Sequence, residues 1–400
     1  MAAELITIAE ARERVLAAVR RLEPERIAVA EALDRVLAAE LEAAGDVPPF
    51  DSSAMDGYAV APGPAGRTLP VVGESRAGAP SDHPLADGEA IRISTGAAVP
   101  PGVVAVIPQE QVEARDGAVV IGTAVTQGDH VRPAGEVMRA GAVVLAPGTR
   151  LGPGELAAAI AAGAGELTVA RRPVVRVLCT GDELREPGSP LAPGQIHNSN
   201  GPMLVALAKH SGALTSPAEL LADDRVATEA GLASALAGAD VVIVSGGVSV
   251  GPHDHVKPAL ASLGVEERFW GVALQPGKPT WFGTREHVLV FGLPGNPVSA
   301  AVTFSLFAAP ALAALQGAAV PMTTTGDAVL GTSVRRNTRR EQAIRVRLER
   351  RDGSTVAIPN GAQDSHALTS LLGADALALI PRGEGELEAG TTVALAPLPG

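Results

Sequence analysis

Three apolar runs of strand length, each followed by a short turn rich in Gly, Pro, acids or hydroxyls, form the clearest pattern along the chain. They are VVRVLC with TGDEL (174–184), DVVIVS with GGVSVGPHD (240–254) and VLVF with GLPGNPVSA (288–300). Runs of β-branched residues without polar alternation are typical of strands buried on both faces of a sheet. A parallel sheet places its binding loops at the carboxyl ends of such strands. We therefore expect three loops to converge on one site.

Strand and helix patterns alternate from 173 to about 318. Strands are predicted at 174, 214–220, 241 and 288, and helices near 200–211, 224–237, 255–263 and 297–316. This order predicts an open parallel sheet with right-handed crossovers.

The flanking segments have other patterns. Residues 7–21 begin with a Thr in N-cap position and carry an apolar stripe, which predicts a helix. A second helix is predicted near 153–162, and we expect it to pack on the first. Short Val- and Ile-rich runs between 46 and 137 predict a small β domain, which would then be an insertion. Similar runs predict a second β module in 319–400.

Composition and charge narrow the class of protein. With 46% hydrophobic and 19% charged residues, the 400-residue chain is globular in type. A net charge of −12 disfavours a nucleic-acid partner. We find no signal segment and no long apolar stretch free of charges or breakers, so we expect a cytoplasmic protein without a membrane span. Cys179 is the sole cysteine, which excludes an intramolecular disulfide, and its position favours a packing role over a reactive thiol.

Arginines crowd one segment near the C-terminus: Arg335, Arg336, Arg339, Arg340, Arg345, Arg347, Arg350 and Arg351. The alternation in IRVRLER (344–350) puts Arg on one strand face and Ile, Val and Leu on the other. A solvated face of a small sheet is one interpretation, and an anion-facing wall is the other.

Two loops of the predicted β domain could carry chemistry. PPFDSSAMDGYAV (48–60) presents Asp56 after a rigid Pro-Pro entry, although Asp and Ser there could simply cap their own turn. IRISTGAAVPPG (91–102) ends a strand in Ser94, Thr95 and Gly96, which suit an oxyanion but equally a plain turn.

The three strand-end loops hold further candidates. After Thr180 and Gly181, Asp182 and Glu183 place two carboxylates where a sheet binds ligands, and they could hold Mg²⁺. Asp223 and Asp224 could instead start a helix.

Glycines in SGGVSVG let backbone N–H groups approach an anion, so Ser245, Gly246, Gly247 and Ser249 form a candidate phosphate cradle. The Pro-bounded loops PGKP, with Lys278, and PGNPVSA, with Pro297 at an early helical position, look preorganised.

Taken in order, six motifs make the chain resemble the MoeA family of molybdopterin molybdenumtransferases, bacterial relatives of the gephyrin E domain. The motifs are PPFDSSAMDGYAV, IRISTGAAVP, TGDEL, SGGVSVG, QPGKP and GLPGNPVSA. The likeness covers nearly the whole chain and implies a multidomain α/β fold. Its implied domains are a helical connecting and dimerisation domain (1–45 and 138–172), an inserted β domain (46–137), a molybdopterin-binding α/β domain with a parallel sheet (173–318) and a C-terminal β barrel (319–400).

The resemblance also implies a reaction and an assembly. Family members act in molybdenum cofactor biosynthesis, where they insert molybdate-derived molybdenum into adenylylated molybdopterin with Mg²⁺ and release AMP. They are homodimers whose site lies between the α/β domain of one subunit and the β domain of the other. Contact with a molybdopterin adenylyltransferase is a further implied interaction.

Motif matching carries the family's functional residues to this chain. Implied catalytic residues are Asp56, Thr95, Glu183, Asp223 and Asp254, with Glu183 and Asp254 at the metal. Implied substrate-binding residues are Thr180, Gly181, Asp182, Ser245, Gly246, Gly247, Ser249, Lys278, Pro294, Gly295, Asn296 and Pro297, with Arg132, Arg345 and Ser365 in looser segments.

Four departures from the family's pattern concern charge. Val137 replaces a common Asp, Asn198 replaces the Asp of a Tyr-Asp-Ser-Asn turn, and Gly271 and Gln275 replace two lysines. These losses leave open a non-catalytic molybdopterin-binding or scaffold protein of the same family.

Overall fold

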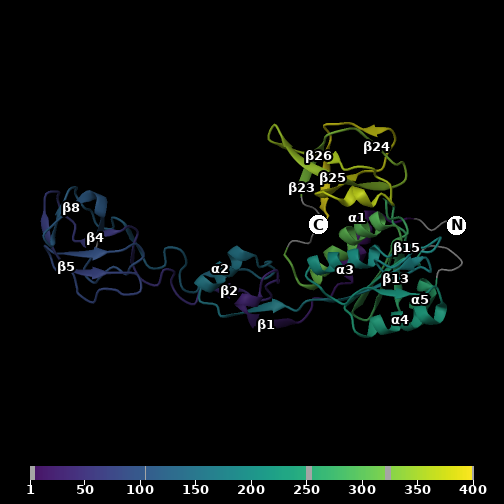
Figure 1. Ribbon diagram of the computed structural model, residues 1–400, viewed down its shortest axis with the longest axis horizontal. Helices are drawn as coiled ribbons and strands as arrows, with labels where there is room; N and C mark the ends of the chain where they lie inside the picture. The colour runs from purple at the N-terminus through teal and green to yellow at the C-terminus, as the bar shows by residue number, and fades with distance from the viewer. Residues whose placement is uncertain (1–4, 104, 249–254, 320–325, 399–400) are drawn as a thin grey trace.

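The computed structural model describes residues 5–103, 105–248, 255–319 and 326–398. Ser249 and Asp254, both expected in the site, lie outside the described residues. The molecule is elongated, with the inserted β domain at one end, a connecting unit in the middle, and the α/β domain with the C-terminal module at the other end (Figure 1). The multidomain α/β fold expected from the sequence is confirmed.

A mixed sheet forms the centre of the α/β domain. Its strands run in the order β16-β13-β18-β22-β21-β19, with β17 also pairing with β13. The strands are β13 (Val174–Thr180), β16 (Leu214–Thr215), β17 (Glu219–Leu221), β18 (Val241–Ser245), β19 (Glu266–Trp270), β21 (Trp281–Arg285) and β22 (Val288–Leu293). The helices are α3 (Asn200–His210), α4 (Arg225–Ala237), α5 (Val256–Ser262), α6 (Pro297–Thr303), η3 (Phe304–Ala308) and α7 (Ala309–Leu315). Strands β14 (Leu184–Arg185) and β15 (Ile196–His197) form a small ladder beside the sheet.

The three apolar runs are buried on both faces of this sheet, as their composition predicts. In β18, Val241 and Ile243 join the core on the side of α3, α6 and α7, whereas Val242 and Val244 join the core on the side of α4 and α5. Because successive side chains point to opposite faces, a strand covered by helices on both sides needs apolar residues at every position.

The sheet is parallel through its predicted strands, but β21 and β19 add an antiparallel edge that was not predicted. The sequence analysis missed both. The first three residues of β19 are exposed, which weakens its apolar signal. Gly283 interrupts β21, and glycine is usually a sign against a strand interior. It is needed there because a Cβ at Gly283 would collide with the ring of Trp281.

The first helix, α1 (Ile8–Ala17), begins as predicted, with Thr7 Oγ1 accepting from the amide of Glu10 at 3.1 Å. The expected packing of α1 against the helix near 153–162 is wrong. The buried side of α1 lies in the same core cluster as α3, α6 and α7, whereas α2 (Pro153–Ala161) belongs to the core of the connecting unit. Figure 1 shows α1 with the α/β domain and α2 in the middle of the molecule. An amphipathic stripe predicts that a helix is covered, but not by what.

The connecting unit is built from two antiparallel ribbons and α2. The ribbons pair β1 (Pro24–Ala28) with β12 (Glu166–Ala170), and β2 (Leu41–Glu42) with β11 (Val143–Leu145). The 3₁₀ turn η1 (Val29–Glu31) follows β1. Segments from before and after the β domain therefore pair with each other, which makes that domain an insertion.

The inserted β domain has a six-stranded sheet in the order β7-β4-β6-β5-β9-β8. Its elements are β3 (Ser52–Ser53), β4 (Gly57–Val60), β5 (Thr68–Ser75), β6 (Ala90–Ile93), β7 (Ala105–Pro108), η2 (Gln109–Gln111), β8 (Val112–Arg115), β9 (Ala118–Ile121) and β10 (Val131–Arg132). Short strands β3 and β10 pair where the chain enters and leaves the domain.

The C-terminal module is a closed barrel, because β25, β26, β23, β29 and β27 pair in turn and β27 pairs again with β25. Its elements are β23 (Gly326–Leu330), β24 (Val334–Arg335), β25 (Glu341–Arg351), β26 (Ser354–Pro359), η4 (Leu368–Leu371), β27 (Ala376–Ile380), β28 (Glu386–Leu387) and β29 (Thr392–Pro397). Strand β20 (Leu274–Gln275) of the preceding domain adds to β25. Ala343, Leu377 and Ala396 extend the α/β core into the barrel.

The helix of residues 297–315 is long and apolar enough to cross a membrane by length and composition, but 94% of its tested window is buried inside the molecule. It is a core helix. Pro310 does not end it as a breaker would, because the π turn η3 precedes the proline and changes the hydrogen-bond spacing.

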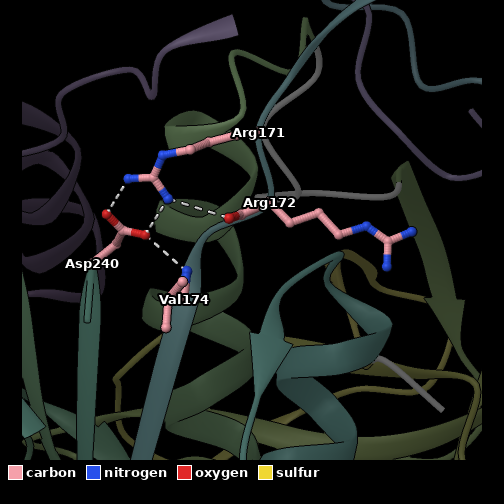
Figure 2. A network of polar contacts seen from close by, with 4 residues as sticks. All are labelled: Arg171, Arg172, Val174 and Asp240. Carbon is pink, nitrogen blue, oxygen red and sulfur yellow. Dashed lines mark hydrogen bonds and ion pairs between the residues drawn. The ribbon is translucent and has the colours of Figure 1, made fainter. Parts of the chain in front are cut away.

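A bidentate ion pair fixes the chain where it enters the α/β domain. The guanidinium of Arg171 contacts both carboxylate oxygens of Asp240 at 2.7 and 2.6 Å, and Asp240 also accepts from the amide of Val174 at 2.8 Å (Figure 2). Asp240 precedes β18, so the pair ties the linker to the amino-terminal edge of the sheet.

Candidate active site at the strand ends

The turns after β13, β18 and β22 meet at the carboxyl edge of the sheet, which confirms the expected convergence of three loops. Gly246 has φ +92°, and a Cβ there would lie 2.7 Å from the carbonyl oxygen of Thr180. On its other side, a Cβ at Gly295 would lie 4.0 Å from the Cα of Gly246. Glycine at 246 is therefore required both by its backbone angle and by the close approach of Thr180.

A cavity of about 120 Å³ opens between these turns. Its walls come from four strand-end segments, and its lining residues are Cys179, Thr180, Glu183, Leu184, Ile196, His197, Asn198, Ser199, Asn200, Ser245, Gly295 and Pro297. Pro297 begins α6 at an early position, as predicted. The carboxyl edge of a sheet flanked by helices is where such domains bind ligands.

Asp182, in the turn after β13, is hydrogen-bonded to Asp223, in the turn after β17. The amide of Asp223 donates to Asp182 Oδ1 at 3.1 Å, and the amide of Asp182 donates to Asp223 Oδ2 at 3.3 Å. Asp224 instead caps α4, accepting from the amide of Ala227 at 2.9 Å. The helix-start interpretation therefore holds for Asp224, whereas Asp223 joins the site loops.

Glu183 follows Asp182 and lies at the cavity with its carboxylate exposed. Its carboxylate folds back over Gly181, because a Cβ at Gly181 would be 2.6 Å from Glu183 Oε2. Within the described residues, no group of three His, Cys, Asp or Glu side chains is arranged to hold a metal. The carboxylates present fit Mg²⁺, which needs only one or two from the protein and completes its shell with water and phosphate.

Cys179 and Asn198 form the floor of the cavity. Burial raises the pKa of the Cys179 thiol to about 11, although a hydrogen bond from the Asn198 side chain opposes this shift. A thiol with so high a pKa is not a nucleophile at neutral pH, which supports its predicted packing role. Asn198 Oδ1 also accepts from the backbone amide of Gly201 at 2.9 Å. The Asn198 side chain therefore satisfies a free N–H group in the first turn of α3.

The C-terminal module reaches this edge through one loop. Ser365 Oγ accepts from Asn296 Nδ2 at 3.0 Å, which links two residues expected in the site. Arg345, which the family resemblance implies as an anion contact, lies inside the protein. It is fully buried, and its guanidinium donates to Ser370 Oγ at 3.0 Å and to the carbonyls of Ala362 and Asp364 at 3.2 and 3.3 Å.

The solvated-face interpretation of the arginine segment therefore holds only in part. Arg347, Arg350 and Arg351 are exposed. Arg345 lies where the barrel's outer face meets the 360–370 loop. Burial lowers the pKa of Arg345 to about 10, and Asp364 opposes this shift.

The turn that carries Lys278 packs on α6. A Cβ at Gly277 would lie 2.5 Å from Thr303 Cγ2, and the carbonyl of Lys278 accepts from the amide of Val272 at 3.0 Å. The Lys278 side chain is exposed. Gln275, one of the family departures, accepts from Asn337 Nδ2 at 2.6 Å and so contacts the C-terminal module.

Asp56 and Thr95 are brought together in the inserted domain, where Asp56 Oδ1 accepts from the amide of Thr95 at 2.7 Å. Arg132 lies close by on β10, opposite Ser52 of β3. Asp56, Thr95 and Arg132 are exposed. Within one chain they do not meet the strand-end cavity, because the inserted domain and the α/β domain lie at opposite ends of the molecule (Figure 1).

Two residues that make polar contacts at the site, Asn200 and Trp270, were not predicted from the sequence. Asn200 binds two of the strand-end loops, and Trp270 Nε1 donates to the carbonyl of Val248 at 3.0 Å beside the Gly-rich turn. Lys257 lies 4.6 Å from the Trp270 ring centroid. Neither residue has a local signal of such a contact, because Trp270 stands between Phe269 and Gly271 and the partners of Asn200 are distant in the sequence.

Comparisons with known proteins cover nearly all of the chain. Three family profiles match: the MoeA N-terminal region (domain I and II) at residues 6–163, a probable molybdopterin binding domain at 176–314, and the MoeA C-terminal region (domain IV) at 327–398. Molybdopterin molybdenumtransferase 2 of Mycobacterium tuberculosis is 39% identical over 86% of this chain and 88% of its own length. Molybdopterin molybdenumtransferase of Haemophilus influenzae is 42% identical over 68% of each chain. A crystal structure of a molybdopterin biosynthesis MoeA protein from a Pyrococcus species superposes with a TM-score of 0.82 at 32% identity, covering 99% of this chain and all of the other.

Proposed function

The chain belongs to the MoeA family, and from this premise we propose that it is a Mg²⁺-dependent molybdopterin molybdenumtransferase of molybdenum cofactor biosynthesis. It takes adenylylated molybdopterin and molybdate, transfers molybdenum to the pterin and releases AMP. The observation that carries this proposal is the convergence of Thr180, Gly246 and Gly295 around a cavity with acidic loops beside it. A phosphate-bearing substrate fits there because glycine turns bring backbone N–H groups close to an anion.

Within this site, Ser245, Gly246 and Gly247 bind a phosphate of the substrate, and the 294–297 turn closes the other side. Glu183, together with Asp254, would hold Mg²⁺, and Mg²⁺ would neutralise charge that develops on the phosphoanhydride. Asp182 and Asp223 hold the two acidic loops in register through their paired hydrogen bonds.

The proposed assembly is a homodimer. Asp56, Thr95 and Arg132 form a polar group at the far end of the same chain. A second copy could bring this group over the strand-end cavity, so the dimer would supply the β-domain half of the site. Light scattering tests this point: a mass near 80 kDa, about twice 40.3 kDa, supports the dimer, and a mass near 40 kDa at micromolar concentration refutes it.

The enzymatic test is AMP release from adenylylated molybdopterin in the presence of molybdate and Mg²⁺. We expect Glu183→Ala to lower the rate at least tenfold. Glu186→Ala is the matched control, since Glu186 is an exposed acid of the same segment that does not line the cavity. No AMP release by the unaltered protein, or equal rates for Glu183→Ala and the unaltered protein, would refute the proposal.

A second candidate is a non-catalytic molybdopterin-binding scaffold, favoured by Val137. This residue is 67% exposed and replaces a common acid of the family, so it offers no ligand for a cation. Restoring nitrate reductase activity in a bacterial strain that lacks molybdenum insertion separates the candidates, because a scaffold cannot restore it. A cytoplasmic location and contact with a molybdopterin adenylyltransferase complete the proposal.

A further inference from the structure

Asn200 joins two loops of the site through one amide group. It is the first residue of α3 and is 8% exposed. Its Nδ2 donates to Ser245 Oγ at 2.9 Å and to the carbonyl of Gly295 at 2.7 Å. Three segments far apart in the sequence therefore meet at a single side chain.

The orientation of this amide follows from its partners. A backbone carbonyl only accepts hydrogen bonds, so the NH₂ of Asn200, not its oxygen, must face Gly295. The same NH₂ also donates to Ser245 Oγ. This bond occupies one acceptor lone pair of the Ser245 hydroxyl. The hydroxyl proton of Ser245 is left free to donate in another direction.

We propose that Asn200 is a positioning residue that turns the Ser245 hydroxyl into a donor aimed at a phosphate of the substrate and fixes the 245–246 turn against the 294–296 turn. The inference rests on the proposed function, because it assigns the phosphate group to this edge of the cavity. The two turns are already joined by the backbone, because the amide of Gly246 donates to the carbonyl oxygen of Leu293 at 3.1 Å. The Asn200 amide adds a side-chain link between the same two turns, so one residue can set the geometry of both.

Asn200→Asp tests the proposal because a carboxylate has the same shape but only accepts. In this variant the Ser245 hydroxyl would donate its proton to the new carboxylate, so the proton would no longer be available to a ligand. The carbonyl of Gly295 would lose the hydrogen bond that Asn200 donates. With AMP as the probe in calorimetric titrations, we expect the Kd to rise at least about tenfold. Ser245→Ala should weaken AMP binding similarly, and the double variant should be no weaker than either single variant, because both act through one hydroxyl.

Gln316→Glu is the matched control, because Gln316, which follows α7, contacts Ser211 at the C-terminal end of α3. Gln316 is 4% exposed, and its Nε2 also donates to two carbonyls, those of Ser211 and Leu312, at 3.0 and 2.9 Å. This variant should lose thermal stability as Asn200→Asp does but keep its affinity for AMP. Equal weakening of AMP binding in both variants would mean that Asn200 acts through stability alone, and would overturn the inference.

Hydrogen exchange of the ligand-free protein keeps the inference separate from the proposed function. Amides in 241–248 and 288–297 should exchange about tenfold faster in Asn200→Asp than in Gln316→Glu. Unchanged exchange there overturns the positioning role whatever the ligand. If exchange is faster in Asn200→Asp but the unaltered protein does not bind AMP, the coupling of the two turns is upheld and the proposed function is refuted. Asn200→Ala serves if the Asp variant does not fold.

Discussion

Arg12 on α1 donates through Nε to the carbonyl oxygen of Leu306 at 3.2 Å. In an α-helix this carbonyl would accept from residue 310, but residue 310 is a proline without an N–H. The guanidinium therefore reaches an acceptor that the proline leaves without its α-helical donor, at the π turn of the buried helix. Desolvation by burial lowers the pKa of Arg12, and the charge of Glu341 opposes this shift.

We expect Arg12→Met to lower the free energy of unfolding by about 1–3 kcal/mol, because it removes a charged donor from a buried carbonyl. Arg14→Met on the same helix is the control. Arg14 forms an exposed i,i+4 ion pair with Glu10, and its loss should cost at most about 0.5 kcal/mol. Urea denaturation measures both values, and equal values would show that the Leu306 contact contributes nothing.

Asp240 should make the molecule sensitive to acid. Burial alone raises the pKa of Asp240, but hydrogen bonds from Arg171 and Val174 outweigh burial and lower it below the usual value. A carboxylate with a lowered folded-state pKa stabilises the fold above its unfolded pKa of about 3.9, and this stability is lost as pH falls through the folded pKa. Asp240→Asn should therefore be less stable at neutral pH and lose less stability below about pH 4. Thermal melts from pH 7 to pH 3 check this, and parallel curves for both proteins would contradict it.

Asn198→Asp introduces the residue that the family resemblance implies at this position, yet we expect it to destabilise this chain by about 1–3 kcal/mol. Asn198 is 4% exposed, and its amide hydrogen-bonds the buried Cys179 thiol. A carboxylate at 198 would still accept from Gly201 but could not donate to Cys179, and burial would disfavour its charge. The loss should grow with pH as the new carboxyl ionises. Denaturant midpoints at pH 5 and pH 8 measure it, and a variant that is more stable at pH 8 would refute this reasoning.

Gly246→Ala should cost more stability than Gly264→Ala. Both glycines have positive φ, +92° and +77°, so both variants have the backbone strain of about 1 kcal/mol. A Cβ at Gly264 meets no atom within 4 Å, whereas one at Gly246 meets the Thr180 carbonyl at 2.7 Å. The difference between the two unfolding free energies measures the contact between strand-end loops. We expect it to exceed about 1 kcal/mol, and a difference near zero would mean that the loops separate freely.

The strand-end loops could be predicted from sequence because a strand buried on both faces has an unbroken apolar run, and its turn follows directly. Asn200 could not be assigned a role, since its partners are 45 and 95 residues away. The burial of Arg345 could not be predicted, because alternation places it on the barrel's outer face but does not reveal that the 360–370 segment covers that face. The prediction of what covers α1 failed for the same reason, because an apolar stripe fits any complementary surface.

The core that includes Ile8 and Val15 also includes Phe307, Leu377 and Ala396. During synthesis, the first helix leaves the ribosome long before the residues that will cover it. Its apolar side is not fully covered until almost the whole polypeptide has been made. The inserted domain takes its own core from residues 59–131 and can fold before then. The first helix is therefore among the last elements to reach its final position. Until then its apolar side is exposed to chaperones that bind nascent chains.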